Sequence, residues 1–101
     1  MDVEEVGEYA ATLAGCKRKG TASRPAWYVH DRLVARLTEP GVLLVRVPME
    51  RRDELVRDFP DTFGVPPRMD SHHKVEAYLD DGDAEGICAA IRLAWDMQRR
   101  H

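Results

Sequence analysis

The 101-residue sequence lacks the motifs, ligand spacings and long apolar runs that mark catalysis, metal binding and membrane insertion. No apolar run approaches the ~20 residues that cross a bilayer, so we expect no membrane-spanning segment and no membrane partner. Cys16 and Cys88 are the only cysteines, too few for a disulfide framework. The sequence has no Cys-x-x-Cys or His-x-x-x-His spacing and no glycine-rich phosphate loop. We therefore predict no catalytic residues, no metal site and no cofactor, and we do not expect an enzyme.

Positive charge is not in excess, because 15 Lys and Arg residues face 18 Asp and Glu residues for a net charge of −3. Non-specific nucleic-acid binding rests largely on phosphate neutralisation, so this balance argues against a general nucleic-acid coat protein. A local basic patch can still override a mildly acidic total. The acidic N-terminal segment, MDVEEVGEY, resembles neither a signal peptide nor a transit peptide. We therefore expect a cytoplasmic protein.

Apolar residues make up 44% of the chain and charged residues 33%, which is typical of a folded domain with a charged surface. The length predicts one domain over residues 1–101. A chain of this size can bury a core without disulfides or metals.

Residues 25–47 carry the densest strand signal and predict three antiparallel strands. The first is Trp27–His30, which is rich in aromatic and β-branched residues, and Asp31-Arg32 reads as the hairpin connection after it. The second, Leu33–Leu37, alternates with Leu33, Ala35 and Leu37 inward and Val34 and Arg36 outward. A turn at Glu39-Pro40-Gly41 leads to the third strand, residues 42–47, with Leu43, Val45 and Val47 inward.

Helical periodicity and capping signals predict helices over residues 3–14, 49–59 and 84–99 and one more strand over residues 74–79. Asp2 and Glu5 form a capping box, and Gly15 is a plausible end of the first helix. Glu54 and Arg57 are expected to pair on the second helix. The fold class is therefore α+β, in the order α-β-β-β-α-β-α, with an antiparallel sheet of four to five strands flanked by helices. The fifth strand would come from the basic segment 17–24, at the sheet edge.

The alternation leaves Tyr28, His30, Arg36 and Arg46 on the outer face of the sheet. The simplest interpretation of this face is a solvated surface, and the alternative is a basic, aromatic patch that contacts nucleic acid or an acidic partner. The run Lys17, Arg18 and Lys19 has the same two interpretations, a solvated loop or an arm for phosphates.

Several runs in this order resemble the MmcQ/YjbR family. They are Pro25-Ala26-Trp27-Tyr28-Val29, Arg32-Leu33-Val34-Ala35-Arg36-Leu37, the helical ERRDELVRDFP, Phe63-Gly64-Val65, and Ala94-Trp95 in the last helix. The likeness covers nearly the whole chain. The sequence departs from the family pattern at Asp31-Arg32, where members commonly carry Gly-Lys. It also departs at Pro66-Pro67-Arg68, where a Thr-Pro-His-type run is frequent in the family.

The resemblance implies a frataxin-like (CyaY-like) arrangement and a DNA-binding double wing. We therefore expect DNA binding through a basic sheet and loop surface. The candidate nucleic-acid-binding residues are Lys17, Arg18, Lys19, Arg24, Arg32, Arg36 and Arg46. The alternative is a protein-interaction or small-ligand-binding domain with no nucleic-acid role, suggested by the acidic total and by an outer face that carries Tyr28, His30 and Tyr78.

Overall fold

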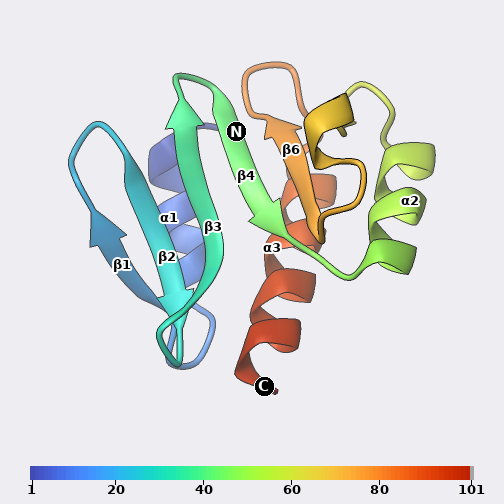
Figure 1. Cartoon of the computed structure of the whole chain (residues 1–101). Coiled ribbons are helices and arrows are strands. Elements are labelled where there is room, and N and C mark those ends of the chain that lie inside the picture. The colour runs from blue at the N-terminus through green and yellow to red at the C-terminus, as the bar shows by residue number, and fades with distance from the viewer. Residues whose placement is uncertain (101) are drawn as a thin grey trace.

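The computed structural model describes residues 1–100 and contains three α-helices, one 3-10 helix and six strands (Figure 1). In chain order the elements are α1 (Val3–Ala11), β1 (Lys17–Gly20), β2 (Pro25–Val29), β3 (Arg32–Glu39), β4 (Val42–Arg46), α2 (Met49–Asp58), β5 (Phe63–Gly64), η1 (Pro67–Met69), β6 (Lys74–Tyr78) and α3 (Ala84–Arg99). None of the described helices is long and apolar enough to span a bilayer.

The strands form one antiparallel sheet in the spatial order β1-β2-β3-β4-β6-β5. The predicted α+β class is confirmed, and the late strand β6 pairs with β4 of the meander. The sheet has six strands, where we predicted four to five. The basic segment supplies the edge strand β1, and the two-residue strand β5 is too short to give a periodic signal.

Two helices, α1 and α3, cover one face of the sheet, whereas α2 lies beside β5 and β6 (Figure 1). The core lies between the sheet and these helices. Its fully buried side chains include Leu43, Val45, Val75, Ile87 and Ile91. The helices leave the other face of the sheet uncovered, and η1 stands over its β4–β6 side. This uncovered side, which we call the open face, is where a partner could contact the strands directly.

A β-bulge in β3 changes the predicted side-chain alternation. Trp27 pairs with Ala35, but Tyr28 pairs with Leu33, so Val34 is an extra residue on β3. Val34 is therefore buried in the core, and Leu33 is only half-buried. This contradicts the prediction of Leu33 inward and Val34 outward, because a bulge puts two neighbouring residues opposite one and resets the alternation.

The hairpin between β2 and β3 turns one residue earlier than we predicted. His30 and Asp31 have φ values of 51° and 61°, so they are the two central residues of the turn, and Arg32 already belongs to β3. Such a turn needs positive φ at both positions, which Asn-Gly adopts most easily. The sequence lacks that signal here, which explains the misplaced boundary.

The first helix has the predicted capping box, in which Glu5 N donates to Asp2 Oδ1 and Asp2 N donates to Glu5 Oε1. It ends at Ala11, before the predicted residue 14. Thr12 caps it, since its hydroxyl donates to Tyr9 O at 2.6 Å and Leu13 N turns back to Ala10 O. These short-range bonds tighten the last turn and end the helix ahead of Gly15.

The second helix carries a buried arginine that its polar sequence did not predict. Arg52 is 5% exposed, and its guanidinium donates to the carbonyl oxygens of Met69, Asp70 and His72. The predicted Glu54–Arg57 pair does not form. Glu54 pairs with Arg51 at 2.8 Å instead, and Arg57 pairs with Asp58.

The third helix spans the predicted residues, and the Asp83 carboxylate accepts bonds from Glu85 N and Gly86 N at its start. Near its other end, the buried Gln98 donates to Leu33 O at 2.7 Å. This bond joins α3 to the strand that carries the bulge. Cys88 lies in an apolar helical pattern that favours a buried thiol, but the structure leaves it half-exposed.

Candidate nucleic-acid interface

The open face carries two rows of side chains that run across the strands. Because residues paired between antiparallel strands point to the same face, the register places Lys19, Ala26, Arg36, Leu44 and Glu76 in one row. The second row begins with Lys17, Tyr28 and Leu33 and ends with Arg46 and Lys74. Arg36 and Arg46 therefore share a face, as the strand alternation predicts.

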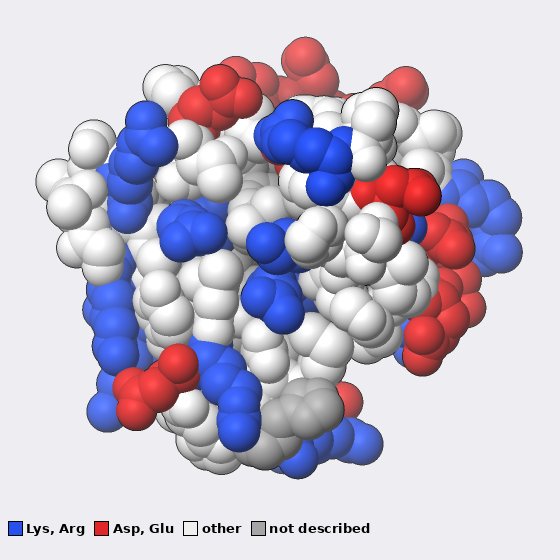
Figure 2. All heavy atoms as spheres, viewed as in Figure 1, with Lys and Arg blue, Asp and Glu red and all other residues white. Residues whose placement is uncertain are grey.

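Acidic residues are scarce on this face. Figure 2 shows Lys and Arg side chains spread over the sheet, with most Asp and Glu at the margins of the view. Among the described residues, no carboxylate lies within ion-pair distance of Lys17, Arg36, Arg46 or Lys74. Arginines on α2 and on α3 with its C-cap are mostly paired, including Arg51, Arg57, Arg99 and Arg100, although Arg92 has no ion-pair partner within residues 1–100. Unpaired positive charge is thus concentrated on the sheet.

Arg46 and Lys74 form the most unusual part of the open face, because two cations stand directly opposite each other on β4 and β6. Like charges in a cross-strand pair are destabilising. In addition, Arg46 Nε is buried and has no hydrogen-bond acceptor among the described residues. A buried donor without a partner carries a desolvation cost. An anion between these two side chains would relieve both costs.

The other end of the second row surrounds a hollow of about 290 Å³, lined by Lys17, Lys19, Tyr28, His30 and Asp31 among others. Lys19 Nζ lies 3.0 Å from Asp31 Oδ1 and 5.1 Å from the centre of the Tyr28 ring. The hydrogen bond from Lys19 lowers the pKa of the Asp31 carboxyl, and the charges of Lys17 and His30 add to this effect. Asp31 is therefore a carboxylate held among cations.

A larger hollow of about 500 Å³ lies over β4 and β6, where η1 forms a wall. Its lining includes Leu44 and Lys74 from the sheet and Arg68, Met69 and His72 from the wall. Arg68 Nη2 lies 3.6 Å from Glu76 Oε2. This ion pair neutralises Glu76, the one carboxylate of the first row. The floor is thus partly apolar, and the charges of the lining without an ion pair among the described residues are Lys74 and, at the edge near the end of β3, Glu39.

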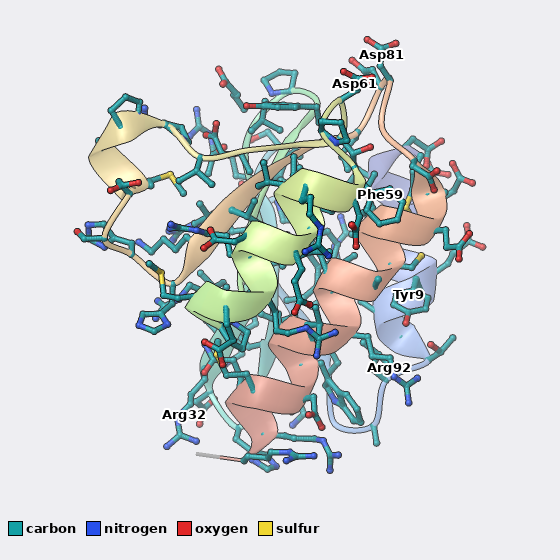
Figure 3. All side chains as sticks on the ribbon, turned by 90° about the vertical axis from the view of Figure 1, so that its right-hand side faces the viewer. Tyr9, Arg32, Phe59, Asp61, Asp81 and Arg92 are labelled. Atoms are coloured by element: carbon teal, nitrogen blue, oxygen red, sulfur yellow. The ribbon has the colours of Figure 1, made fainter. Side chains whose placement is uncertain are left out.

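The structure separates some of the predicted binding residues from the others. Arg18 pairs with Trp27 across the strands, and its guanidinium lies 5.8 Å from that ring, on the side covered by α1. Arg32 Nη1 donates to Gln98 O of α3, and Figure 3 shows Arg32 at the end of the molecule opposite the acidic loops with Asp61 and Asp81. Arg24 is exposed in the β1–β2 hairpin loop. The open face therefore retains Lys17, Lys19, Arg36 and Arg46 from the predicted set.

Lys74 belongs to this surface but is not in the predicted set. Strand alternation already places Lys74 on the outer face of the sheet. What the sequence does not reveal is that β6 pairs with β4 in the register that sets Lys74 beside Arg46. That register depends on contacts between segments far apart in the chain.

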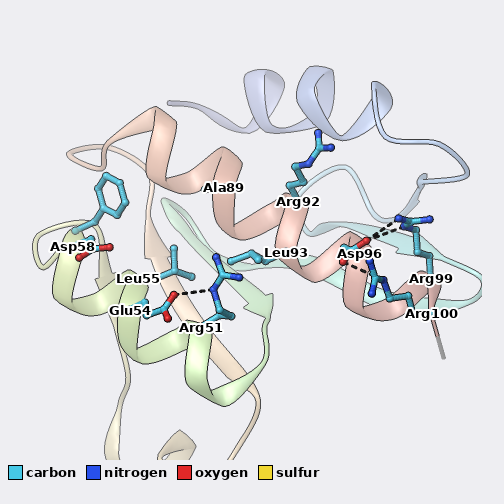
Figure 4. Close-up of a pocket in the computed structure, with 11 residues that line it drawn as sticks. Arg51, Glu54, Leu55, Asp58, Ala89, Arg92, Leu93, Asp96, Arg99 and Arg100 are labelled. Carbon is cyan, nitrogen blue, oxygen red and sulfur yellow. Dashed lines mark hydrogen bonds and ion pairs between the residues drawn. The ribbon is translucent and has the colours of Figure 1, made fainter.

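A separate groove of about 630 Å³ lies between α2 and α3 (Figure 4). Its apolar lining comes from Leu55, Phe59 and Leu93, and Figure 4 shows several of its charged residues bonded to one another, with Arg92 apart from them. Arg51 bonds to Glu54, and Arg99 and Arg100 both bond to Asp96. The hydrogen bond from Arg99 lowers the pKa of the Asp96 carboxyl. Most of its charges therefore satisfy one another, and Arg92 is the lining cation without an ion-pair partner among the described residues.

The residues that could support metal or thiol chemistry are dispersed. Within residues 1–100, no three His, Cys, Asp or Glu side chains come together as a metal-binding group. Burial raises the pKa of the Cys16 thiol, which is opposite to the shift that activates a cysteine nucleophile.

The molecule is thus an α+β protein whose antiparallel sheet has one face covered by helices and one face open and basic. It is similar in structure to protein DR2400 of Deinococcus radiodurans, a crystal structure described as a DUF419 domain, with a TM-score of 0.75 and 20% sequence identity. The match covers 95% of this chain and 77% of that chain. At this identity the likeness shows a shared fold. No family model matches the sequence, and no curated protein is similar to it.

Proposed function

We propose that this protein belongs to the MmcQ/YjbR-like proteins and binds DNA through the open face of its sheet. The sequence runs in β2, β3 and α2 support the family, and the fold shared with a DUF419 domain is compatible with it. The single observation that carries DNA binding is the group of unpaired cations Lys17, Arg36, Arg46 and Lys74 on one face of a protein of net charge −3. Its two free thiols suit the reducing cytoplasm, where we propose that it acts.

A salt titration tests the proposal. If about four phosphates are neutralised, the logarithm of the affinity for duplex DNA falls with the logarithm of salt concentration at a slope between about −3 and −4. Fluorescence anisotropy with a labelled duplex at low salt measures this slope. Absence of binding at low salt to this duplex and to each of its separate strands would exclude the proposal.

A matched pair of variants distinguishes DNA binding by the open face from a general effect of the protein's net charge. The test variant replaces Lys17, Arg36 and Arg46 with Gln, and the control replaces Arg51, Arg57 and Arg100 with Gln. Both remove three positive charges, so a long-range effect of net charge weakens binding equally in both. We expect the test variant to lose most of the affinity and to show a slope smaller by about 3, and the control to bind nearly as the wild type does. Equal losses in the two variants would contradict a specific face.

An interaction or small-ligand role without nucleic acid is the second candidate, and the groove between α2 and α3 favours it. Its volume of about 630 Å³ is within the range of ligand sites, and Phe59 and Leu93 offer half-exposed apolar surface there. Changes in the amide chemical shifts of the protein on addition of small apolar acids from a library would distinguish the two candidate functions. Shifts confined to α2 and α3 favour the groove, and shifts confined to the strands favour the open face.

A further inference from the structure

The shape of the open face bears on which form of nucleic acid it can take. From β1 to β6 the face spans five strands, and neighbouring strands lie about 4.8 Å apart, so the cations extend over roughly 19 Å. The major groove of duplex DNA is about 12 Å wide and admits a helix or a two-stranded ribbon. A face this broad cannot enter the groove, and a duplex could contact it only through its backbone.

The hollow beneath η1 restricts a duplex further. Lys74 lies in this hollow between the sheet and a wall that contains Met69 and His72. The rigid double helix presents a convex surface that cannot follow such a wall, whereas a single strand can bend into the hollow. The pair Arg46 and Lys74, with the buried and unpartnered Arg46 Nε, thus forms an anion site that a flexible backbone can reach.

The second row also supplies the apolar contacts that a single strand uses. Between the cations at its two ends lie Tyr28 and Leu33, both half-buried. A base stacks on an aromatic side chain without regard to sequence. In the structure, Lys19 Nζ lies over the Tyr28 ring. A base that stacks on this ring would displace the ammonium group, and the long side chain of Lys19 can then reach a neighbouring phosphate. Cations flanking an aromatic and aliphatic centre are the pattern of single-strand sites.

We propose that the open face binds single-stranded nucleic acid, with the strand crossing β1 to β6 along the second row. This rests on the proposed function and narrows its ligand. A base stacks on Tyr28, and Lys17 and Lys19 bind phosphates at one end. Arg46 and Lys74, which stand opposite each other on β4 and β6, bind a phosphate at the other end, beside the hollow. Arg36 contacts the backbone between them from the adjacent row.

Competition between matched oligonucleotides tests the inference. A labelled oligothymidylate, an oligouridylate and a mixed-sequence duplex of the same length are titrated with the full chain at one low salt concentration. We expect both single strands to bind at least about tenfold more tightly than the duplex, with a salt slope near −3 because each phosphate of a single strand contributes about −0.7. Duplex binding as tight as single-strand binding would overturn the inference and leave the proposed function standing. No binding by any of the three would exclude both.

Two variants of Tyr28 test the stacking contact. Tyr28→Leu keeps an apolar side chain on the strand but removes the ring, and we expect it to weaken single-strand binding about tenfold. Tyr28→Phe keeps the ring and should bind as the wild type does. Thermal unfolding followed by circular dichroism verifies that each variant is folded. Unchanged single-strand affinity in folded Tyr28→Leu would contradict stacking on this ring.

Single substitutions of Arg46 and Lys74 test the cation pair, and their unfolding temperatures show whether each variant is folded. Arg46→Gln removes the charge with the buried Nε, and Lys74→Gln removes the charge in the hollow. We expect each to lower single-strand affinity several-fold more than Arg51→Gln, whose site is on α2. Because the like-charged pair is itself unfavourable, both variants should unfold at the wild-type temperature or above it. Affinities equal to that of Arg51→Gln would overturn the role of the pair.

Discussion

At the scale of single residues, buried polar side chains connect parts of the fold that are distant in sequence. Gln98 bonds to Leu33 O and Arg52 bonds to three carbonyl oxygens of the segment before β6. Each side chain satisfies backbone acceptors that the bulge and the 3-10 turn leave without strand partners. Such bonds matter most through the cost of leaving a buried acceptor unpaired.

We predict that Gln98→Ala lowers the free energy of unfolding by about 1–3 kcal/mol, because it leaves the carbonyl of Leu33 without its donor. Urea denaturation measures the change. The matched control is Arg100→Ala on the same helix, which breaks an exposed pair with Asp96 and should cost less than about 0.5 kcal/mol. Equal small effects of the two substitutions would show that the Gln98 bond contributes little.

The lowered pKa of Asp31 gives a prediction for acid stability. A carboxyl whose pKa is lower in the folded state stabilises the fold above its ordinary pKa of 3.8, and that contribution is lost as pH falls through the lowered value. The melting temperature of the wild type minus that of Asp31→Asn should therefore decrease from about pH 6 to about pH 2.

Comparing this melting-temperature difference at the two pH values isolates the effect of the Asp31 charge. Asn also adopts positive φ more easily than Asp, but that effect does not depend on pH. In a Lys19→Gln background, the main cause of the shift is absent and most of the pH dependence should disappear. A wild-type difference that is constant with pH would contradict the assignment.

At the scale of elements, sequence periodicity predicted the three long helices, the meander and the late strand, and it gave the bounds of α3 correctly. It could not reveal the bulge at Val34, because the side chains before and after the bulge are all apolar and fit either register. It also could not reveal that Arg52 is buried, since an arginine among charged residues has the pattern of an exposed face.

The same limit applies to the binding surface. Strand alternation predicted that Arg36 and Arg46 share a face, which the register confirms. It misplaced Arg18, which lies beside α1, because the strand Lys17–Gly20 has no apolar side chain that would indicate which side faces inward. Arg32 was misplaced because the turn begins one residue earlier than the sequence indicates.

The segment between β5 and β6 should depend on Arg52 more than on any exposed arginine of α2. We predict that Arg52→Ala lowers the free energy of unfolding by roughly 3 kcal/mol, because three carbonyl oxygens lose a charged donor. Arg51→Ala, its neighbour, loses only an exposed pair with Glu54 and should change stability by less than about 0.5 kcal/mol.

Hydrogen exchange locates the effect of that substitution. Amides of residues 69–74 should lose protection in Arg52→Ala before the rest of the sheet does. Uniform loss of protection across the chain would indicate that Arg52 supports the whole core instead.

At the scale of the whole molecule, charge is distributed by layer. The helices carry half of the 18 acidic residues, and their arginines are mostly paired, with Arg92 the exception among the described residues. The open face of the sheet carries the unpaired cations Lys17, Arg36, Arg46 and Lys74, and Figure 2 shows Lys and Arg side chains spread over it. The edge strand β1 belongs to the basic layer, and all four of its residues are exposed. Charged side chains on an edge strand also prevent strands of different molecules from pairing. Lys17 and Lys19 can therefore serve solubility as well as binding.

We predict that the double variant Lys17→Thr, Lys19→Thr associates as its concentration is raised, because Thr favours strand pairing and the edge loses its charge. Light scattering after size-exclusion chromatography measures the average mass. The control Arg51→Thr, Arg57→Thr has the same net charge but alters a helix. A mass that does not rise with concentration, or rises equally in the control, would contradict the protective role of β1.

The position of α3 at the end of the chain has a consequence for biosynthesis. This helix covers β3, β4 and β2, which are made long before it. While the ribosome translates the second half of the message, the meander can already pair locally, but of the two helices that cover its apolar side only α1 has been made. A nascent chain stalled before Ala84 would expose that side to chaperones, and release from them should coincide with the emergence of the last helix.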